Sequence, residues 1–331
     1  MEYTMFDKPI RVYGIYNFDK THKNQRLTPE LRKELDLEYL GRRTPGARIA
    51  FRTNSEKVRI TVRLASLSPD IGISIYGCQS AKVYVGKGNK ACYRLLISPK
   101  SYTEKEFSGS FTKCGELEDI MIFLPRNEPI ENVIIELQDG AQILPPTPYK
   151  YEKPILFFGS SITEGGCCTT VTNAYTALLS QWLDCDYYNY GFSGSCRGQL
   201  QLAELFSDMD ISAFVLDYDH NAPTADFLEK THRPFFELVR ERKPNLPILM
   251  LTAPNYEYMS EADKRREIIR NTYETALAKG DKNVYFLDGK DLFGEENREC
   301  CTVDRIHPND LGFYRMAKKI YPTLKQILEK E

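Results

Sequence analysis

The sequence lacks any run of about eighteen apolar residues, the length that a membrane-spanning helix needs. Its amino terminus, Met-Glu-Tyr-Thr-Met-Phe-Asp-Lys, has no basic segment followed by an apolar one, so we expect no export signal. The sequence also has no large excess of charge of one sign, because it contains 44 Lys and Arg and 46 Asp and Glu, which gives a net charge of -2. This balance creates no overall field for nucleic acid or an anionic membrane, and we expect neither as a partner.

Cysteine spacing limits the metal and redox chemistry. The nine cysteines show no repeated C-x-x-C spacing, and four of them form the neighbouring pairs Cys167-Cys168 and Cys300-Cys301. We favour reduced thiols in a cytoplasmic protein, with no cofactor and no metal. The alternative is a redox or metal site to which both pairs contribute.

Residues 1–145 show the two-residue period of antiparallel strands. Short strands with glycine and proline between them predict a β-sandwich, jelly-roll-like in layout, as an accessory domain. We expect strands at residues 57–64, 71–75, 82–85, 93–97, 120–124 and 133–137, and a short helix at 29–40.

A proline-rich segment follows, with three prolines in four positions, and predicts a stiff linker over residues 146–153. Beyond it, strands and helices alternate, which predicts a three-layer α/β/α domain over residues 154–331. We expect strands near residues 154–158, 187–192, 211–216, 248–251 and 284–287, and helices near 175–182, 227–240, 261–277 and 308–328. The last helix is expected to bury the stripe Leu311, Tyr314, Ala317, Tyr321, Leu324 and Leu328.

A candidate nucleophile follows the first of these strands. The apolar run before Gly159 ends in two serines, as a buried parallel strand does when it opens into a loop at its carboxyl edge. Near the end of the chain, Asp304 stands three residues before His307, in a loop that precedes a helix. Ser161 as nucleophile, His307 as general base and Asp304 as its orienting partner are the set needed for acyl transfer. A purely structural Asp304–His307 hydrogen bond is the alternative.

Two further loops follow strands and offer hydrogen-bond donors. The first contains Ser193-Gly194-Ser195, and the second contains Asp219-His220-Asn221-Ala222. The N–H groups of Ser161 and Gly194 and the side-chain amide of Asn221 are expected to form an oxyanion hole. His220 and Arg197 are candidate substrate contacts, although a structural loop histidine and a solvated arginine are the alternatives.

These four stretches together resemble the SGNH, or GDSL-like, serine hydrolase superfamily. The resemblance covers residues 153–331 and implies a flavodoxin-like three-layer fold with an esterase triad. Two blocks depart from the family pattern. Ser160 stands where aspartate is usual, and the asparagine block begins with Asp219 and ends with Ala222 in place of glycine and aspartate.

The two-domain layout resembles carbohydrate esterases that remove acetyl groups from plant polysaccharides, so a serine esterase for short-chain acyl esters of a sugar or oligosaccharide is expected. An acyltransferase, lipase or thioesterase of the same fold is the alternative. A carbohydrate-binding protein with an inactive hydrolase half is disfavoured, because nucleophile and base are both retained. A dyad without Asp304 also stays open, since some members of this branch orient the histidine with a backbone carbonyl.

Overall fold

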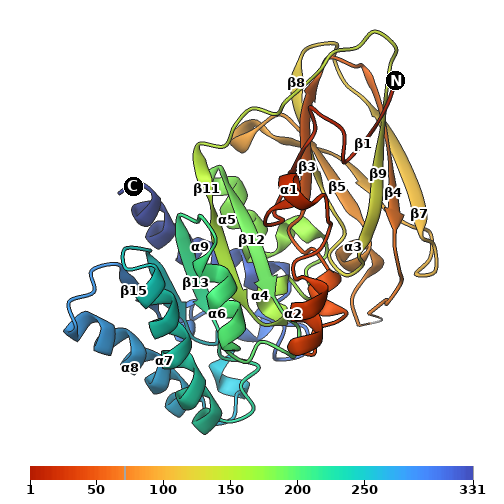
Figure 1. Ribbon diagram of the computed structural model, residues 1–331. Coiled ribbons are helices and arrows are strands. Elements are labelled where there is room, and N and C mark those ends of the chain that lie inside the picture. The colour runs from red at the N-terminus through yellow and green to blue at the C-terminus, as the bar shows by residue number, and fades with distance from the viewer. Residues whose placement is uncertain (71, 331) are drawn as a thin grey trace.

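Two antiparallel sheets pack face to face in the first part of the computed structural model, which describes residues 1–70 and 72–330 (Figure 1). The first sheet has the order β1 (Glu2–Thr4), β9 (Ile130–Leu137), β4 (Lys57–Leu64) and β7 (Glu106–Thr112). The second has the order β10 (Ile143–Leu144), β3 (Arg48–Thr53), β8 (Glu118–Phe123), β5 (Ala81–Val85) and β6 (Cys92–Ile97), with β2 (Arg11–Tyr13) also paired to β3. Short helices connect them: α1 (Phe18–Thr21), α2 (Pro29–Glu34) and α3 (Ile75–Cys78).

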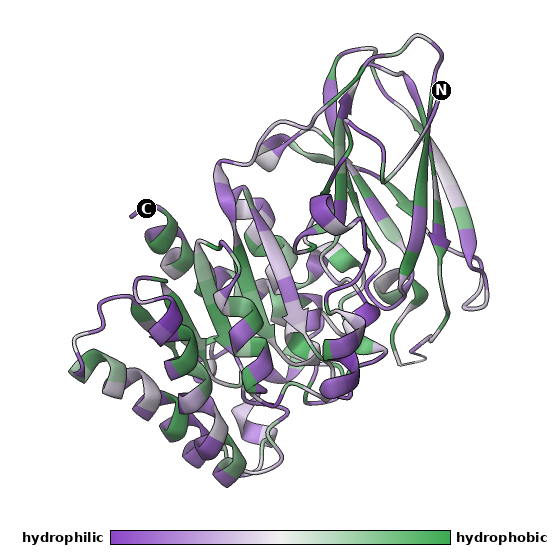
Figure 2. Ribbon diagram, viewed as in Figure 1, coloured by the Kyte–Doolittle hydropathy of each residue, from purple (hydrophilic) through white to green (hydrophobic). Residues whose placement is uncertain are grey.

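Alternating side chains explain the sandwich. In β4, Val58, Ile60 and Val62 are buried in the core between the sheets, whereas Lys57 and Arg59 face solvent. A strand whose side chains alternate in this way can bury one face against a second sheet and leave the other face wet. The predicted β-sandwich is therefore confirmed, and Figure 2 shows the alternation along its strands.

The strand expected at residues 71–75 is wrong. Asp70 Oδ1 accepts the N–H of Gly72 at 3.1 Å, and the side chain of Ser74 caps α3 by accepting the N–H of Gly77 at 3.3 Å. Ile71 lies outside the described residues. The turn at Asp70 and the helix cap at Ser74 therefore determine the conformation of this segment, although its isoleucines repeat every two residues. The helix expected at 29–40 is shorter and ends at Glu34.

A parallel sheet forms the second part, in the order β12 (Cys185–Gly191), β11 (Tyr151–Gly159), β13 (Ala213–Asp217), β14 (Ile248–Leu251) and β15 (Val284–Leu287). Numbered along the chain, this is the 2-1-3-4-5 order of flavodoxin-like folds. One face carries α6 (Leu200–Ser207), α7 (Ala225–Arg242) and α8 (Ala262–Ala278), and the other carries α5 (Tyr175–Leu183) and α9 (Asp310–Leu328) (Figure 1).

Strand β11 shows why these strands are apolar throughout. Leu156 and Phe158 pack into the core beneath α6 and α7, whereas Ile155 and Phe157 pack into the core beneath α5 and α9. Both faces of the strand are covered, so both sets of side chains must be apolar. The predicted α/β/α fold is confirmed, and Figure 2 shows the hydrophobic strands between the two helical layers.

Helix α9 has the expected extent, and Ala317, Leu324 and Leu328 are buried as expected, but the rest of the expected stripe is not. Phe313, Met316 and Ile320 are buried, whereas Leu311 and Tyr314 are 40% and 47% exposed. Tyr314 packs edge-on against Trp182 of α5, with ring centroids 5.7 Å apart. Apolar side chains occupy both stripes, so the helical period alone does not choose between them.

The two parts of the chain share buried contacts. Arg26 donates to the carbonyls of Asn189 and Gly191, at 3.0 and 2.5 Å, and Leu27 and Leu37 belong to the core of the parallel sheet. At the opposite end of β12, buried Arg48 of β3 pairs with Asp186. That residues 146–153 form a linker between two domains stays a prediction. Within the described residues, no helix is long and apolar enough to cross a membrane.

Candidate active site

A tight turn places Ser161 at the carboxyl end of β11. Ser160 is the N-cap of the short helix α4 (Ser161–Glu164), and its side chain accepts the N–H of Ile162 at 3.1 Å. Aspartate and serine are both good N-cap residues, because each offers a side-chain oxygen to an unpaired N–H of the first turn. Ser160 therefore fills the structural role that the usual aspartate would have at this position.

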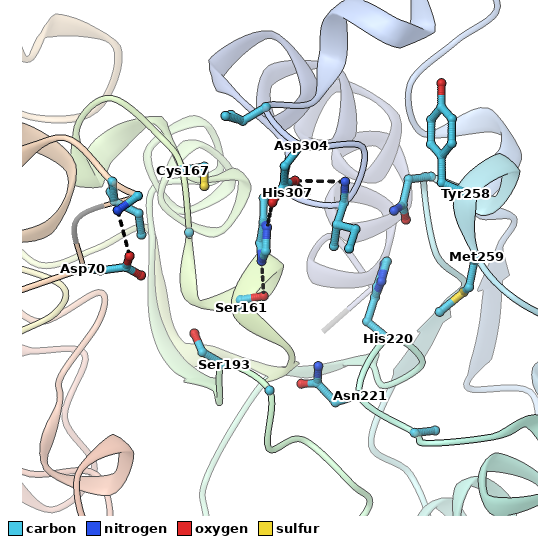
Figure 3. A pocket seen from close by; sticks show the side chains of 18 of the residues that line it. Asp70, Ser161, Cys167, Ser193, His220, Asn221, Tyr258, Met259, Asp304 and His307 are labelled. Atoms are coloured by element: carbon cyan, nitrogen blue, oxygen red, sulfur yellow. Dashed lines mark hydrogen bonds and ion pairs between the residues drawn. The ribbon is translucent and has the colours of Figure 1, made fainter.

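Three predicted side chains meet in one hydrogen-bonded line (Figure 3). The Oγ of Ser161 lies 2.9 Å from Nε2 of His307, and Nδ1 of His307 lies 2.7 Å from Oδ2 of Asp304. The loop that carries Asp304 and His307 is closed by a bridge between Thr302 and Pro308. A serine whose hydroxyl contacts an imidazole, itself oriented by a carboxylate, has the geometry of an activated nucleophile.

Asp304 also holds the backbone of its own loop. Its Oδ1 accepts the N–H of Ile306 at 3.0 Å and the N–H of His307 at 2.7 Å. Partial burial raises the pKa of Asp304, but the hydrogen bonds from His307 and Ile306 outweigh it and lower the pKa below its usual value. The carboxylate is therefore ionised at neutral pH, as an orienting partner of an imidazole must be.

The predicted glycine block forms a turn beside the nucleophile. The N–H of Ser195 donates to the carbonyl of Phe192 at 3.0 Å, which closes the turn around Ser193 and Gly194. Gly194 has φ of +68°, and an added Cβ would meet no atom within 4 Å. Backbone conformation, and not lack of space, is what requires glycine here.

Asn221 reaches the same cavity from the loop after β13. Its Oδ1 accepts the N–H of Cys196 at 3.2 Å, which leaves the Nδ2 group to face the cavity near Ser161 (Figure 3). The predicted donors from Ser161, Gly194 and Asn221 thus all line one cavity. Donors that converge on one point can stabilise a developing oxyanion, and this role of the three groups stays a prediction.

The cavity has a volume of about 890 Å³ and is lined from both parts of the chain. Asp70, Ile73 and Arg126 come from the sandwich side, and Tyr258 and Met259 from the loop after β14 (Figure 3). A cavity of this size suits a ligand as large as an oligosaccharide fragment, because small-molecule sites commonly enclose about 300–1,000 Å³.

The two candidate substrate contacts differ. His220 lines the cavity, and burial together with the nearby His307 lowers its pKa to about 3, so its ring is neutral at physiological pH. Arg197 is exposed and does not line the cavity, so its expected contact with substrate is not supported. The backbone N–H of Arg197 donates to the side chain of Gln199 at 3.0 Å.

The thiols of Cys167 and Cys168 are in surroundings that favour their protonated form. Cys167 lines the cavity, but burial and the nearby Asp304 raise the pKa of its thiol. Burial raises the pKa of Cys168 to about 12. Such thiols stay protonated, whereas the thiolate is the form that binds metal or attacks a disulfide. Among the described residues, no group of three or more His, Cys, Asp or Glu side chains is placed to hold a metal ion.

The sequence pattern did not predict a buried cluster of charged side chains beside Ser161. Glu164 of α4 is ion-paired with Arg43 at 3.5 Å and with Arg126 at 3.9 Å, and these three side chains are almost wholly buried. Burial raises the pKa of Glu164, but Arg126, Arg43 and Arg26 together hold it below its usual value. Only its position within the nucleophile block could have drawn attention to Glu164.

Known structures share this fold over nearly the whole chain. A protein from Bacteroides ovatus ATCC 8483, described as a GDSL-like lipase, has a TM-score of 0.87 at 23% identity, with 99% of this chain and 98% of that chain covered. The salicylyl-acyltransferase SsfX3 from a tetracycline biosynthetic pathway has a TM-score of 0.79 at 18% identity, with 99% and 97% covered.

A family two carbohydrate esterase from Clostridium thermocellum, solved in complex with cellohexaose, has a TM-score of 0.62 at 14% identity, with 86% and 93% covered. At these identities the likeness shows the fold alone. No match was found among curated proteins. Residues 152–325 match the model of the GDSL-like Lipase/Acylhydrolase family, which covers more than half of the chain, and the chain therefore belongs to that family.

Proposed function

We propose that this protein is a serine esterase that removes short acyl groups, acetyl above all, from a sugar or oligosaccharide. The observation that carries the proposal is the line from Ser161 Oγ to His307 Nε2 at 2.9 Å and from His307 Nδ1 to Asp304 at 2.7 Å. Membership of a lipase and acylhydrolase family agrees with this chemistry.

In the proposed reaction Ser161 attacks the ester carbonyl while His307 accepts its proton. Charge then develops on the carbonyl oxygen, where N–H groups of Ser161, Gly194 and Asn221 can donate. Collapse of this intermediate expels the sugar alcohol, which takes the proton back from His307. A water molecule, deprotonated by His307, then attacks the acyl-enzyme, and the second collapse releases the carboxylic acid and free Ser161.

The sugar part of the proposal is supported by the cavity and by one of the structural neighbours. Tyr258 lines the cavity and is 49% exposed, so it offers aromatic surface, while Asp70 and His220 supply polar groups within the same cavity. The Clostridium thermocellum esterase with the same fold was solved with a cello-oligosaccharide. An open, mixed apolar and polar cavity is suited to an acylated sugar.

Acyl transfer is the second candidate, favoured by the likeness to a salicylyl-acyltransferase over nearly the whole chain. The same acyl-enzyme would form, but an acceptor alcohol would replace water in the second step. Product analysis distinguishes the two, because a transferase in the presence of acceptor yields a new ester and a hydrolase yields free acid.

The direct test is a screen of acetylated mono- and oligosaccharides, with mass detection of released acetate. We expect wild-type turnover and loss of turnover in Ser161→Ala. Equal release by both proteins would show that the proposed nucleophile is wrong. Preference for long acyl chains would point to a lipase instead of a sugar esterase.

A further inference from the structure

The carboxylate of Glu164 connects the nucleophile helix to the oxyanion loop. Glu164 is the last residue of α4, which begins at Ser161. Its Oε2 accepts the backbone N–H of Ser193 at 3.2 Å and also the hydroxyl of Ser193. Because Ser193 and Gly194 are the two central residues of one turn, the carboxylate fixes the residue directly before the Gly194 N–H.

This contact is closely packed. Strand β12 ends at Gly191, where an added Cβ would lie 2.3 Å from the backbone N of Glu164. The side chain of Glu164 is 0% exposed. A buried side chain with two hydrogen bonds to one turn has no room to adjust, so a change in its charge must alter the turn or the packing around it.

The cations that face Glu164 come from the part of the chain before the parallel sheet. Arg43 lies between α2 and β3, and Arg126 follows β8, so both belong to the sandwich side. Arg26 completes the group and is fixed by the carbonyls of Asn189 and Gly191. A buried carboxylate needs such partners, because desolvation strongly disfavours an isolated charge.

We propose that Glu164 is a positioning residue for the oxyanion hole, and that the N-terminal part of the chain takes part in catalysis by supplying the arginines that hold it. This inference rests on the proposed acyl-transfer chemistry at Ser161. Glu164 acts through Ser193 on the direction of the Gly194 N–H and does not touch the reacting atoms. Glu164 therefore stabilises the transition state, in which the oxyanion exists, and does not contribute to substrate affinity.

The main variant is Glu164→Gln in the full chain. The amide has the same size, but one of its two terminal atoms becomes a donor. The NH₂ group of the amide must then face either the guanidinium of Arg43 or the N–H of Ser193. Both of these groups are donors, so only an acceptor can form a hydrogen bond there. We expect kcat on 4-nitrophenyl acetate to fall about 10- to 100-fold with KM changed less than about threefold, somewhat below the loss of a whole oxyanion donor.

The affinity for a tetrahedral inhibitor is a second measurement, and a general loss of stability would not change it. Phenylboronic acid adds to a serine hydroxyl as a tetrahedral anion, so its affinity reports the oxyanion hole. We expect its Ki to rise in proportion to the fall in kcat. The matched control is Asp186→Asn, which disturbs another buried ion pair between the two parts, at the opposite end of β12. It should lower thermal stability and leave kcat within about twofold.

Ser193→Ala gives a second test, because it removes one hydrogen bond to Glu164 and leaves the charge cluster complete. This variant should lower kcat about three- to tenfold at constant KM. If Glu164→Gln does not fold, Ser193→Ala is sufficient to test the proposal. Unchanged kcat in the folded variants, a loss confined to KM, or an equal loss of kcat in Asp186→Asn would each overturn the positioning role. Turnover that survives Ser161→Ala would instead refute the proposed function.

Discussion

Asp304 and His307 are joined through both oxygens of one carboxylate: Oδ2 lies 2.7 Å from the ring Nδ1, and Oδ1 accepts the backbone N–H of His307 at 2.7 Å. The carboxylate therefore orients the imidazole and also shapes the loop that carries it. A group with both roles is expected to affect activity more than a purely structural loop residue would.

Replacement of Asp304 tests whether the catalytic set has three members. Asp304→Asn should lower kcat by up to about 10⁴-fold, because an amide can favour the wrong tautomer of His307. Asp304→Ala and His307→Ala should both be nearly inactive, with circular dichroism used to show that each is folded. Near wild-type kcat in Asp304→Ala beside an inactive His307→Ala would instead identify a Ser-His dyad.

Removal of the Asn221 amide tests the oxyanion hole. Asn221→Ala should lower kcat about 10²- to 10³-fold, since one donor to the oxyanion is lost. KM should change little, because the donor acts more strongly on the oxyanion than on the ground-state carbonyl. Steady-state kinetics on an activated acetyl ester measures both values. If KM rises while kcat is preserved, Asn221 binds substrate and transition state equally.

Asp217, buried beneath the nucleophile loop, should make stability fall with rising pH. Burial raises the pKa of Asp217 to about 7, although hydrogen bonds from Thr163 and Tyr175 oppose the shift. Between the unfolded pKa of about 4 and the folded value, the unfolded chain has lost this proton while the folded protein keeps it. Stability therefore decreases across that window, by roughly 4 kcal/mol in total.

The variant Asp217→Asn should remove this slope. Both hydrogen bonds go to one carboxylate oxygen, so an amide oxygen in its place can accept both. Urea unfolding at pH 5 and at pH 8 measures the difference between variant and wild type. We expect the variant to gain relative to wild type as pH rises, and a constant difference would assign the pH dependence to other groups.

The buried pair between Arg48 and Asp186 should contribute to stability and not to turnover. Arg48 is 0% exposed and also stacks on Tyr187, with its guanidinium carbon 4.3 Å from the ring centroid. Arg48→Met leaves Asp186 without its ion-pair partner, although the N–H of Tyr187 still donates to its carboxylate, and should cost about 3–5 kcal/mol of unfolding free energy. Denaturant titration measures the loss. A variant as stable as wild type would show that Asp186 finds solvent or another donor.

Much of the candidate site could be predicted because Ser161, Gly194 and Asn221 follow the ends of strands. The apolar run before Gly159 and the turn residues after it are local signals, and the parallel sheet brings its carboxyl edges together. His307 was indicated differently, by the carboxylate of Asp304 three residues before it in the loop that precedes the last helix. These predicted residues all line one cavity. Their catalytic roles, like the cytoplasmic location, stay predictions.

The charge cluster could not be predicted in the same way. Glu164, Arg43 and Arg126 are far apart in sequence, and no spacing rule connects a buried carboxylate with arginines from loops of the sandwich side. Helix α9 shows a related limit. Its extent followed from its pattern, but its pattern did not show that Phe313, Met316 and Ile320 are buried while Leu311 and Tyr314 stay partly exposed. The residues that pack against a segment in the folded protein decide which of its side chains are buried, and a single sequence does not identify those residues.

The contacts of Arg26 also set an order of events during synthesis. The carbonyl groups that accept its hydrogen bonds lie 163 and 165 residues later in the chain. A ribosome that delivers the chain from its amino terminus must therefore expose this segment long before β12 exists, with Leu27 and Leu37 still lacking the core that covers them. Contacts of such long range form slowly, and apolar segments that wait for them are prone to aggregate or to bind chaperones. Arg26, Leu27 and Leu37 are thus synthesised well before the strand and core that bury them.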